Sequence, residues 1–424
     1  MKTLLNTFLL FFIINIAAYF YLENALVSSE HSENVLIDKV AKLKITYPDF
    51  SNEEIMQLIR EDYASRINYY SPLLETRPPY MSGSYVNYTK EGYRKIKNQK
   101  KYNKQDFNIY LFGGSTTFGT SVRDEDTIAS SISLILKEKS NCNKSISVFN
   151  YGTPGHFSTQ EFIRFQELLR KDKKPNIAIF IDGLNDFFRY DDTTFTSLAV
   201  GQQMLSLNEK AIPNNYQYTF GKNFTQKIFE IPGELKDNFK YKENYNLKQF
   251  ISDFKKSLYG LPVVKLAQYI NGTMFQYINT ASFAGSNFVE NKEEKVKVVM
   301  NRLVHNHNNI KLVADSHNIK TLFVLQPTQV INYDLKYSAW LSQKEYNKFS
   351  HLQFIKYGYQ YLEKNNYNNF YENKNFLDLT NIQKDEKRNL YVDPAHYDPY
   401  FSNKIALHIV KKIINSNFIS CKLN

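Results

Sequence analysis

Short apolar runs alternate with amphipathic stretches between about residue 107 and residue 415. Runs rich in β-branched and aromatic residues predict five strands, at Asn108–Phe112, Ser147–Asn150, Ile177–Ile181, Thr321–Leu325 and Phe376–Leu379. Helical spacing of apolar positions predicts helices at Thr127–Lys137, Thr159–Lys171, Glu293–His317 and Phe401–Asn415. Buried strands that alternate with helices are typical of a parallel sheet covered on both faces. We therefore predict an α/β fold, a three-layer α/β/α sandwich whose central parallel sheet has about five strands.

One long stretch interrupts this alternation. Residues 190 to about 290 separate the third and fourth predicted strands, and they are aromatic, lysine-rich and only locally periodic. This stretch is longer than an ordinary crossover connection. We expect an inserted helical lid or substrate-binding subdomain here, within a domain that spans residues 107–420.

The first 23 residues predict a membrane anchor. Residues 4–22 read LLNTFLLFFIINIAAYFYL, and a helix of that length is roughly 28 Å long, enough to cross the hydrocarbon core of a bilayer. Lys2 precedes the run, whereas Glu23 and Glu30 follow it, so the positive-inside bias places the rest of the chain outside the cytoplasm. A cleaved signal peptide is the alternative, although no convincing small-x-small cleavage site follows the run. Both interpretations export the rest of the chain, either as a single-pass protein of the cytoplasmic membrane facing the periplasm or as a secreted one.

Residues 24–106 predict a tether followed by an N-terminal extension. Residues 24 to about 48 are polar and indicate a tether. Ser51-Asn52-Glu53-Glu54 is a capping box that begins a helix, with Ile55, Leu58 and Ile59 as its apolar stripe. Residues 77–95, RPPYMSGSYVNYTKEGYRK, are rich in Pro, Gly and Tyr and predict a loop with short strands.

Charge and cysteine content narrow the possible partners. The formal net charge is +11, but the lysines are scattered and no nucleic-acid motif appears. A diffuse solvated surface is the simplest interpretation, an acidic polysaccharide is a second, and nucleic acid is not an expected partner. The two cysteines, Cys142 and Cys421, form no metal-spaced cluster, and the sequence leaves open whether they form a disulfide. It also leaves the oligomeric state unknown.

Four segments with chemically useful residues follow the predicted strands or precede the last helix. Ser115 lies in GGSTTFG, a glycine-flanked strand-to-helix turn where a nucleophile is accessible and backbone amides can face a negative charge. Gly155 lies in NYGTPGHFS after the second strand, and Asn185 lies in DGLND after the third. Asp393 and His396 lie in DPAH before the final helix. Because sites in such folds form at the carboxyl ends of the strands, we expect all four segments to share one crevice.

These four segments, in this order, resemble the four sequence blocks of the SGNH (GDSL-like) hydrolase family. Ser115 matches the serine of the first block, Gly155 the glycine of the second, Asn185 the asparagine of the third, and Asp393 and His396 the last block. The resemblance covers roughly residues 107 to 415, apart from the insertion. It implies a flavodoxin-like sandwich and a serine hydrolase that needs no cofactor or metal.

The chain departs from the family in its first block. That block is often Gly-Asp-Ser, whereas Gly114 precedes Ser115 here. More loosely, the stretch YVNYTKEGYRK and the long insertion resemble family members associated with bacterial surface-polysaccharide pathways.

The resemblance implies a role for each matched residue. Ser115 would be the nucleophile, His396 its base, and Asp393 the group that fixes the imidazole tautomer. The oxyanion hole would consist of the backbone N–H groups of Ser115 and Gly155 and the side-chain amide of Asn185.

Neighbouring residues leave alternatives open. Asp398 could replace Asp393 as the partner of the histidine, and His156 could line the pocket or take part in catalysis. Asp182 and Asp186 flank Asn185, and we expect them to orient its loop.

The expected activity is that of an extracytoplasmic esterase that removes acyl groups, such as O-acetyl, from a cell-envelope or exported carbohydrate. An acyl-serine intermediate can also pass its acyl group to a sugar hydroxyl, so a polysaccharide O-acyltransferase is a second hypothesis. A non-catalytic glycan-binding or assembly protein that keeps the fold is a third.

Overall fold

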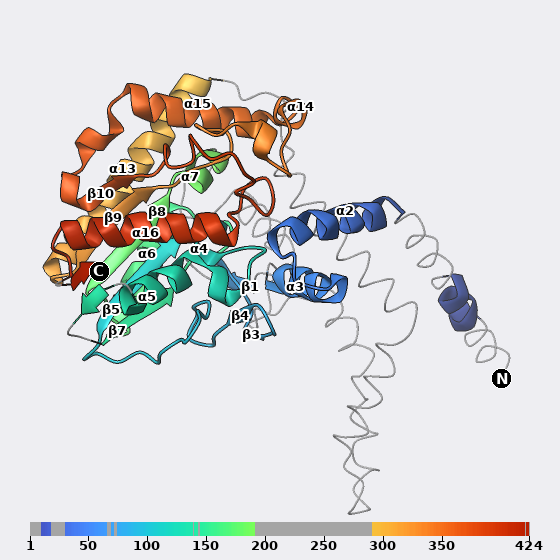
Figure 1. Cartoon of the computed structure of the whole chain (residues 1–424), viewed down its shortest axis with the longest axis horizontal. Helices are drawn as coiled ribbons and strands as arrows, with labels where there is room; N and C mark the ends of the chain where they lie inside the picture. The colour runs from blue at the N-terminus through green and yellow to red at the C-terminus, as the bar shows by residue number, and fades with distance from the viewer. Residues whose placement is uncertain are drawn as a thin grey trace, which may run out of the picture. The chain divides into compact units, whose positions relative to one another are not determined.

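The computed structural model describes residues 10–17, 30–65, 69–71, 74–138, 140–142, 145–190, 291–419 and 421–423. Five parallel strands form a sheet in the order β10-β9-β8-β5-β7 (Figure 1). They are β5 (Phe107–Gly113), β7 (Ile146–Asn150), β8 (Ile177–Asp182), β9 (Lys320–Leu325) and β10 (Phe376–Asp378). Because the chain winds first to one side of β5 and then to the other, this is the flavodoxin-like order. The predicted three-layer fold with five parallel strands is therefore confirmed.

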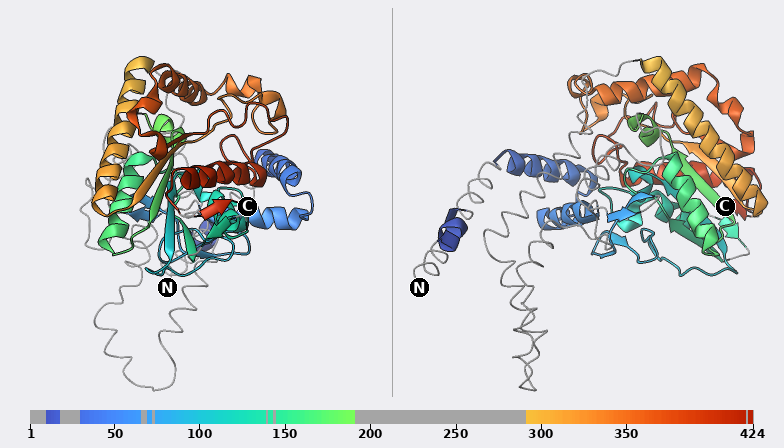
Figure 2. Two further views of the ribbon diagram at one scale, coloured as in Figure 1. Left: turned by 60° about the vertical axis from the view of Figure 1, so that its left-hand side comes forward. Right: turned by 180° about the vertical axis from the view of Figure 1, so that it is seen from behind.

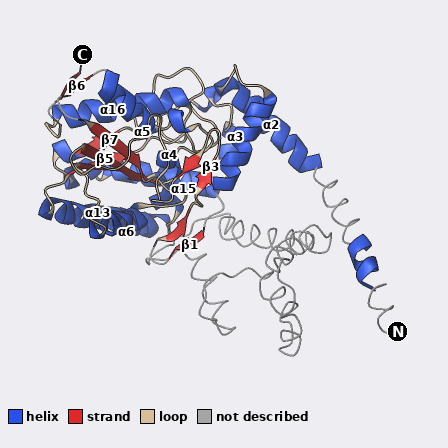
Figure 3. Ribbon diagram, turned by 90° about the horizontal axis from the view of Figure 1, so that it is seen from below, coloured by secondary structure: helices blue, strands red, loops and turns tan. Residues whose placement is uncertain are grey.

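Helices cover both faces of the sheet (Figures 2 and 3). One face packs against α5 (Ile128–Glu138) and α16 (Pro399–Asn415). The other packs against α6 (Ser158–Arg170), α13 (Lys292–Ser316) and α15 (Ser350–Lys364). Side chains alternate between the two faces, so aliphatic residues of the inner strands meet α5 and α16 while rings face α6 and α13. Phe112 and Phe180 stack with ring centroids 4.8 Å apart, so part of the high aromatic content builds this layer.

The four predicted helices are present with bounds close to those expected, but α15 was not predicted. Its buried stripe includes Phe354, Ile355 and Tyr359. Aromatic residues favour strands in isolation, and short apolar runs do not separate helix from strand, which explains the omission. The shorter helical elements are α4 (Ser115–Phe118), α7 (Leu184–Phe188), α14 (Gln343–Tyr346), η1 (Asp124–Asp126), η3 (Leu335–Tyr337), η4 (Tyr367–Phe370) and η5 (Asn373–Asn375).

The N-terminal extension contains α2 (Glu30–Thr46), α3 (Asn52–Ser65) and short strands. The capping box is confirmed, because Ser51 N donates to Glu54 Oε2 at 2.7 Å and Glu54 N donates to Ser51 Oγ at 3.2 Å. Helix α2 occupies most of the predicted tether, and Leu43 near its end is buried. The role of this segment as a tether stays a prediction. The short strands are β1 (Tyr69–Ser71), β2 (Glu75–Arg77), β3 (Met81–Ser82) and β4 (Asn87–Tyr88).

Two predicted segments fall mostly outside the described residues. Of the anchor, only residues 10–17 are described, and they are helical. Within the described parts of the chain, no helix has both the length and the apolar character that crossing a membrane requires. The insertion of residues 190–290 lies outside the described residues except for Tyr190. Both segments therefore stay predictions.

The sheet and the site described below belong to one compact unit, Lys39–Val200 and Ser286–Asn424. In this unit β6 (Ser140–Cys142) pairs antiparallel with β11 (Cys421–Leu423), and the register places Cys421 opposite Cys142.

Candidate active site

Ser115 is the first residue of α4, a single helical turn that directly follows β5. Six of the seven residues of β5 are buried, which fixes the position of its carboxyl end. The first N–H groups of a helix have no acceptor within the helix, and Ser115 N–H donates no hydrogen bond to the described part of the chain. Next to it, Thr116 Oγ1 donates to Gln326 Oε1 at 2.7 Å, which ties the turn to the end of β9. Ser115 is thus a partly exposed hydroxyl on a fixed turn with an amide available beside it.

His396 lies within hydrogen-bond distance of Ser115. The distance from His396 Nε2 to Ser115 Oγ is 2.7 Å, and His396 Nδ1 lies 2.6 Å from Asp393 Oδ2. A carboxylate only accepts hydrogen bonds, so Nδ1 carries the proton and Nε2 is left to accept from the serine hydroxyl. The side chains of His396 and Asp393 are 14% and 16% exposed, so solvent and substrate can reach them.

The turn that carries Asp393 and His396 is held by its own polar groups. Asp393 Oδ1 accepts the backbone N–H groups of Ala395 at 2.8 Å and His396 at 2.9 Å, as in an Asx turn. Gln329 Nε2 donates to the Asp393 carbonyl at 2.7 Å. Val392 N donates to the His396 carbonyl at 2.9 Å and closes the loop. One carboxylate therefore shapes the turn and also orients the imidazole.

Asp398, the alternative partner, does not contact His396. Its carboxylate accepts the N–H of Phe401 at 2.7 Å and caps the N-terminus of α16. Burial raises the pKa of Asp398 to about 6. The structure therefore pairs His396 with Asp393 and gives Asp398 a helix-capping position.

Asn185 lies against the backbone beside Ser115. It belongs to α7, which follows β8, and its Nδ2 donates to the His156 carbonyl at 2.6 Å. A Cβ placed on Gly114 would lie 2.0 Å from Asn185 Nδ2, so no side chain fits at residue 114 while Asn185 keeps its place. Glycine at residue 114 therefore allows the Asn185 side chain to approach the turn that carries Ser115.

Gly155 lies next to this contact and is open to solvent. Its φ of +82° is in the left-handed region that favours glycine, and a Cβ there would meet no atom within 4 Å. Its N–H donates no backbone hydrogen bond among the described residues. The structure therefore places the Asn185 side chain against Gly114, next to the Ser115 amide, and leaves the Gly155 amide exposed one residue before the His156 carbonyl that Asn185 binds.

His156 is not positioned for proton transfer. It is buried, and its Nε2 lies 3.0 Å from the Thr76 carbonyl, which requires Nε2 to carry the hydrogen. Burial lowers the pKa of His156 to about 3, so the ring is neutral at physiological pH. Its backbone carbonyl, which accepts from Asn185, is its contribution to the site.

Three buried carboxyl groups lie behind the Asn185 turn. Asp182 Oδ2 is 2.8 Å from His307 Nε2, and Asp186 Oδ1 accepts from Ser158 Oγ at 2.7 Å. Burial raises the pKa of Glu161 well above its ordinary value, with the charges of Asp182 and Asp186 adding to the effect. No group of three or more metal-binding side chains in the described residues is arranged to hold a metal ion.

The sequence indicated that Asp182 and Asp186 orient the Asn185 loop, but it did not reveal their partners. Glu161 lies in the predicted helix Thr159–Lys171, and nothing in the pattern marks it as buried. Arg302 was also missed: its Nη2 donates to the Asp186 carbonyl at 2.8 Å and its Nη1 to the Arg189 carbonyl at 3.2 Å, at the end of α7. No sequence signal connects Arg302 to Asn185, because their proximity depends on the tertiary fold.

Gly114→Ala is expected to lower kcat about 100-fold, because the methyl group displaces Asn185 and removes one oxyanion donor. Asn185→Ala should cause a similar loss by deleting the donor itself. In the double variant the clash with Asn185 is absent and only the 2.9 Å approach of the Cβ to the His156 carbonyl oxygen remains. Gly114→Ala should therefore lower kcat only a little further in the Asn185→Ala background. Steady-state hydrolysis of an aryl acetate by the four proteins measures this coupling. Fully additive losses would show that residue 114 acts independently of Asn185.

Asp186→Asn is expected to change how stability depends on pH. Burial, reinforced by the charge of Asp182, raises the pKa of Asp186 to about 6. The folded state then holds this proton more tightly than the unfolded state, so the stabilisation is present below about pH 4 and is lost as pH rises through about 6. Asparagine cannot ionise. When the pH is raised from about 4 to about 7.5, the free energy of unfolding of the variant should therefore rise by on the order of 2 kcal/mol relative to that of the wild type.

Urea unfolding at the two pH values measures this difference. Asp385→Asn changes an exposed carboxylate and is the matched control, expected to show no such gain. An equal stability difference at both pH values for Asp186→Asn would contradict the prediction.

Comparison with known proteins gives fold-level likenesses only. No family model and no curated protein matches the chain. Similar solved structures include a lipase/acylhydrolase from Enterococcus faecalis, with 12% identity over 75% of this chain and 99% of that chain and a TM-score of 0.33. A GDSL-like lipase from Bacteroides thetaiotaomicron has 11% identity over 75% and 92% of the two chains, with a TM-score of 0.31. A catalytic mutant of an acetylxylan esterase from Geobacillus stearothermophilus has 11% identity over 74% and 96%, with a TM-score of 0.33.

Proposed function

We propose that this chain is a serine esterase of the SGNH family, with Ser115 as nucleophile, His396 as base and Asp393 as the partner of the base. The observation that carries the proposal is the 2.7 Å distance from Ser115 Oγ to His396 Nε2, with Asp393 bonded to the other ring nitrogen. Ser115 and His396 are 281 positions apart in the chain. A hydroxyl, an imidazole and a carboxylate in this order form the arrangement that activates a serine for acyl transfer.

In the acylation step, Ser115 Oγ attacks the ester carbonyl carbon while His396 Nε2 takes the hydroxyl proton. The carbonyl oxygen becomes an oxyanion that the amides of Ser115 and Gly155 and the side chain of Asn185 can stabilise. The carbon–oxygen bond to the alcohol then breaks, and His396 returns the proton to the leaving alkoxide. Asp393 stabilises the transient imidazolium through Nδ1–H.

In the deacylation step, water replaces the alcohol. The water oxygen attacks the acyl-serine carbonyl while His396 takes a proton from the water. The donors that act in the acylation step also stabilise this second oxyanion. The bond from the carbonyl carbon to Ser115 Oγ breaks, and the proton on His396 passes to the serine. The products are a carboxylic acid and the regenerated hydroxyl.

The proposed substrate is an acylated, exported or cell-envelope carbohydrate, and O-acetyl is the proposed acyl group. The proposed location is the periplasmic side of the cytoplasmic membrane, with secretion after cleavage as the alternative. The apolar N-terminal run and the family resemblance support these proposals. The net charge of +11 is compatible with an acidic polysaccharide.

Acetate release tests the proposal and separates it from its rivals. The purified chain should release free acetate from p-nitrophenyl acetate and from an O-acetylated glycan in the absence of any added sugar acceptor. Acetate that moves only onto an added sugar would instead show an acyltransferase. If neither ester is cleaved and no acyl transfer occurs, the protein is a non-catalytic member of the fold.

A further inference from the structure

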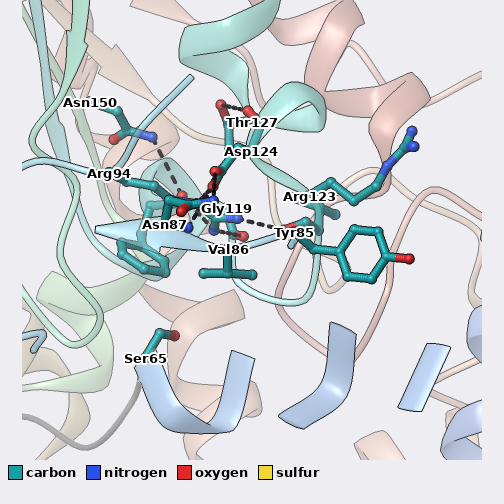
Figure 4. A network of polar contacts seen from close by, with 12 residues as sticks. Ser65, Tyr85, Val86, Asn87, Arg94, Gly119, Arg123, Asp124, Thr127 and Asn150 are labelled. Carbon is teal, nitrogen blue, oxygen red and sulfur yellow. Dashed lines mark hydrogen bonds and ion pairs between the residues drawn. The ribbon is translucent and has the colours of Figure 1, made fainter. Parts of the chain in front are cut away.

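A buried arginine from the N-terminal extension binds the end of the nucleophile helix. Arg94 is fully buried, and its guanidinium donates to the carbonyls of Phe118 at 3.0 Å, Val122 at 2.6 Å and Gly119. Its Cζ also lies 4.7 Å from the centroid of the Phe118 ring. Phe118 is the last residue of α4, and Ser115 is its first. One side chain thus binds the carbonyl groups at the far end of the turn that presents the nucleophile (Figure 4).

Arg94 is itself held on two sides. Its backbone N donates to the Asn150 carbonyl at 2.9 Å, at the end of β7. Its Nε donates to Asp124 Oδ1 at 3.1 Å, and Asp124 also accepts Asn87 N at 3.0 Å and Asn87 Nδ2 at 2.8 Å. Figure 4 shows Asn87, Arg94 and Asp124 close together around Gly119. Asn87 and Arg94 both belong to YVNYTKEGYRK, so this stretch supplies the two partners of Asp124.

An isolated four-residue helix cannot hold its own shape, because helix nucleation is unfavourable without tertiary contacts. Its last carbonyls lack partners within the helix and carry the negative end of the helix dipole. A planar guanidinium can bind several of them at once, whereas an ammonium group is a compact charge without that fork. Asn150 Nδ2 adds a bond to the Thr117 carbonyl at 2.9 Å. Arg94 and Asn150 therefore give side-chain donors to three consecutive carbonyls at this end of α4, those of Thr117, Phe118 and Gly119.

We propose that Arg94 is a positioning residue for Ser115: by binding the C-terminal carbonyls of α4 it sets the distance and direction of the serine hydroxyl relative to His396 and the oxyanion donors. The N-terminal extension, which supplies Arg94, then helps to set the geometry of the site. This inference rests on the proposed esterase function. A positioning residue of this kind affects turnover, because a displacement of about 1 Å at a reacting group can cost about 100-fold in rate.

Arg94→Lys tests the proposal, because lysine keeps the positive charge but lacks the planar guanidinium that binds several carbonyls at once. The expected result is a kcat about 10- to 100-fold lower, with KM within about twofold of the wild type, since Arg94 touches no substrate. The matched control is Arg164→Lys. Arg164 is also buried, with 6% of its side chain exposed, but it donates to the carbonyls of Glu91 and Gly92. The control should keep kcat within about threefold.

Thermal unfolding and the rate of fluorophosphonate labelling are measured on the same proteins. If Arg94→Lys keeps the wild-type kcat, or if both variants lose kcat in proportion to their loss of stability, the proposal is overturned. If Arg94→Lys does not fold, Asn87→Ala is used instead, because it removes a partner of Asp124. This variant should lower kcat and leave KM unchanged. An unchanged kcat would contradict the proposal. If the wild type itself neither turns over nor labels, the esterase function fails instead.

A separate observation concerns the only two cysteines of the chain. The antiparallel register of β6 and β11 sets Cys142 and Cys421 directly opposite each other. Opposed residues in such a pair have Cα atoms about 4.5–5.5 Å apart, within the range of about 4.4–6.8 Å that disulfides span. From this backbone placement we infer that Cys142 and Cys421 form a disulfide that fastens the C-terminus to β6. Two thiols each lose a proton and together give two electrons to a disulfide oxidant, which is reduced to thiols.

Alkylation before and after reduction tests the disulfide. The purified full chain is equilibrated in a glutathione redox buffer and treated with iodoacetamide, and its mass is measured. No alkylation without reductant and two alkylations after reduction are expected, and Cys142→Ser should leave Cys421 open to alkylation or to a glutathione adduct without reduction. Two alkylated cysteines in the unreduced wild type, or two glutathione adducts, would overturn the inference.

Discussion

Ser115→Ala is expected to lower kcat for p-nitrophenyl acetate by about 10⁴- to 10⁶-fold, because removal of the nucleophile leaves only binding and oxyanion stabilisation. The hydroxyl is partly exposed and bonds to His396, so its removal creates no cavity in the core. Stability should therefore change little. Steady-state turnover and thermal unfolding of the same preparations measure both effects.

Ser147→Ala is the matched control for this variant. Ser147 Oγ donates to Asp106 Oδ2 at 2.7 Å, and both residues lie at the amino ends of the strands, the opposite edge of the sheet from the site. Its kcat should stay within about twofold of the wild type. If Ser115→Ala keeps a tenth or more of the wild-type kcat, Ser115 is not the nucleophile.

Asp393→Asn is expected to lower kcat by about 10⁴-fold, as an amide in place of the triad carboxylate stabilises the wrong imidazole tautomer. The amide nitrogen can donate to Nδ1, which moves the imidazole hydrogen to Nε2, where it can no longer accept the serine proton. Asparagine Oδ1 can still accept the N–H groups of Ala395 and His396, so the turn should persist. The loss should therefore appear in kcat with little change in stability.

Asp398→Asn separates the two candidate partners of His396. Asp398 caps α16 through Phe401 N, and asparagine is about as good an N-cap as aspartate. Its kcat should stay within about twofold of the wild type. A large loss for Asp398→Asn together with a normal kcat for Asp393→Asn would reverse the assignment of the histidine partner.

Much of the fold could be predicted because the buried strands have a continuous apolar signature. Ile177–Ile181 was predicted as a strand, and β8 spans Ile177–Asp182. The four segments at the carboxyl edge could be placed together, since the topology of a parallel sheet brings its strand ends to one rim. The structure brings Ser115, His396 and Asp393 into hydrogen-bond contact and sets Asn185 against Gly114.

The supporting contacts could not be predicted, because they depend on tertiary packing and leave no periodic signal. Arg94 lies in a loop and reads as an ordinary surface arginine, yet it is fully buried. Glu161 lies on an amphipathic helix, yet it is buried beside the carboxyl groups of Asp182 and Asp186.

The most direct test is the mass of the whole chain after reaction with a fluorophosphonate, followed by peptide mapping. A hydroxyl activated by an imidazole displaces fluoride from phosphorus, so we expect a single adduct on Ser115. Labelling should be lost in Ser115→Ala and strongly slowed in His396→Ala. Labelling of another residue, or labelling of Ser115 at the same rate without His396, would contradict the claim that these side chains form one catalytic unit.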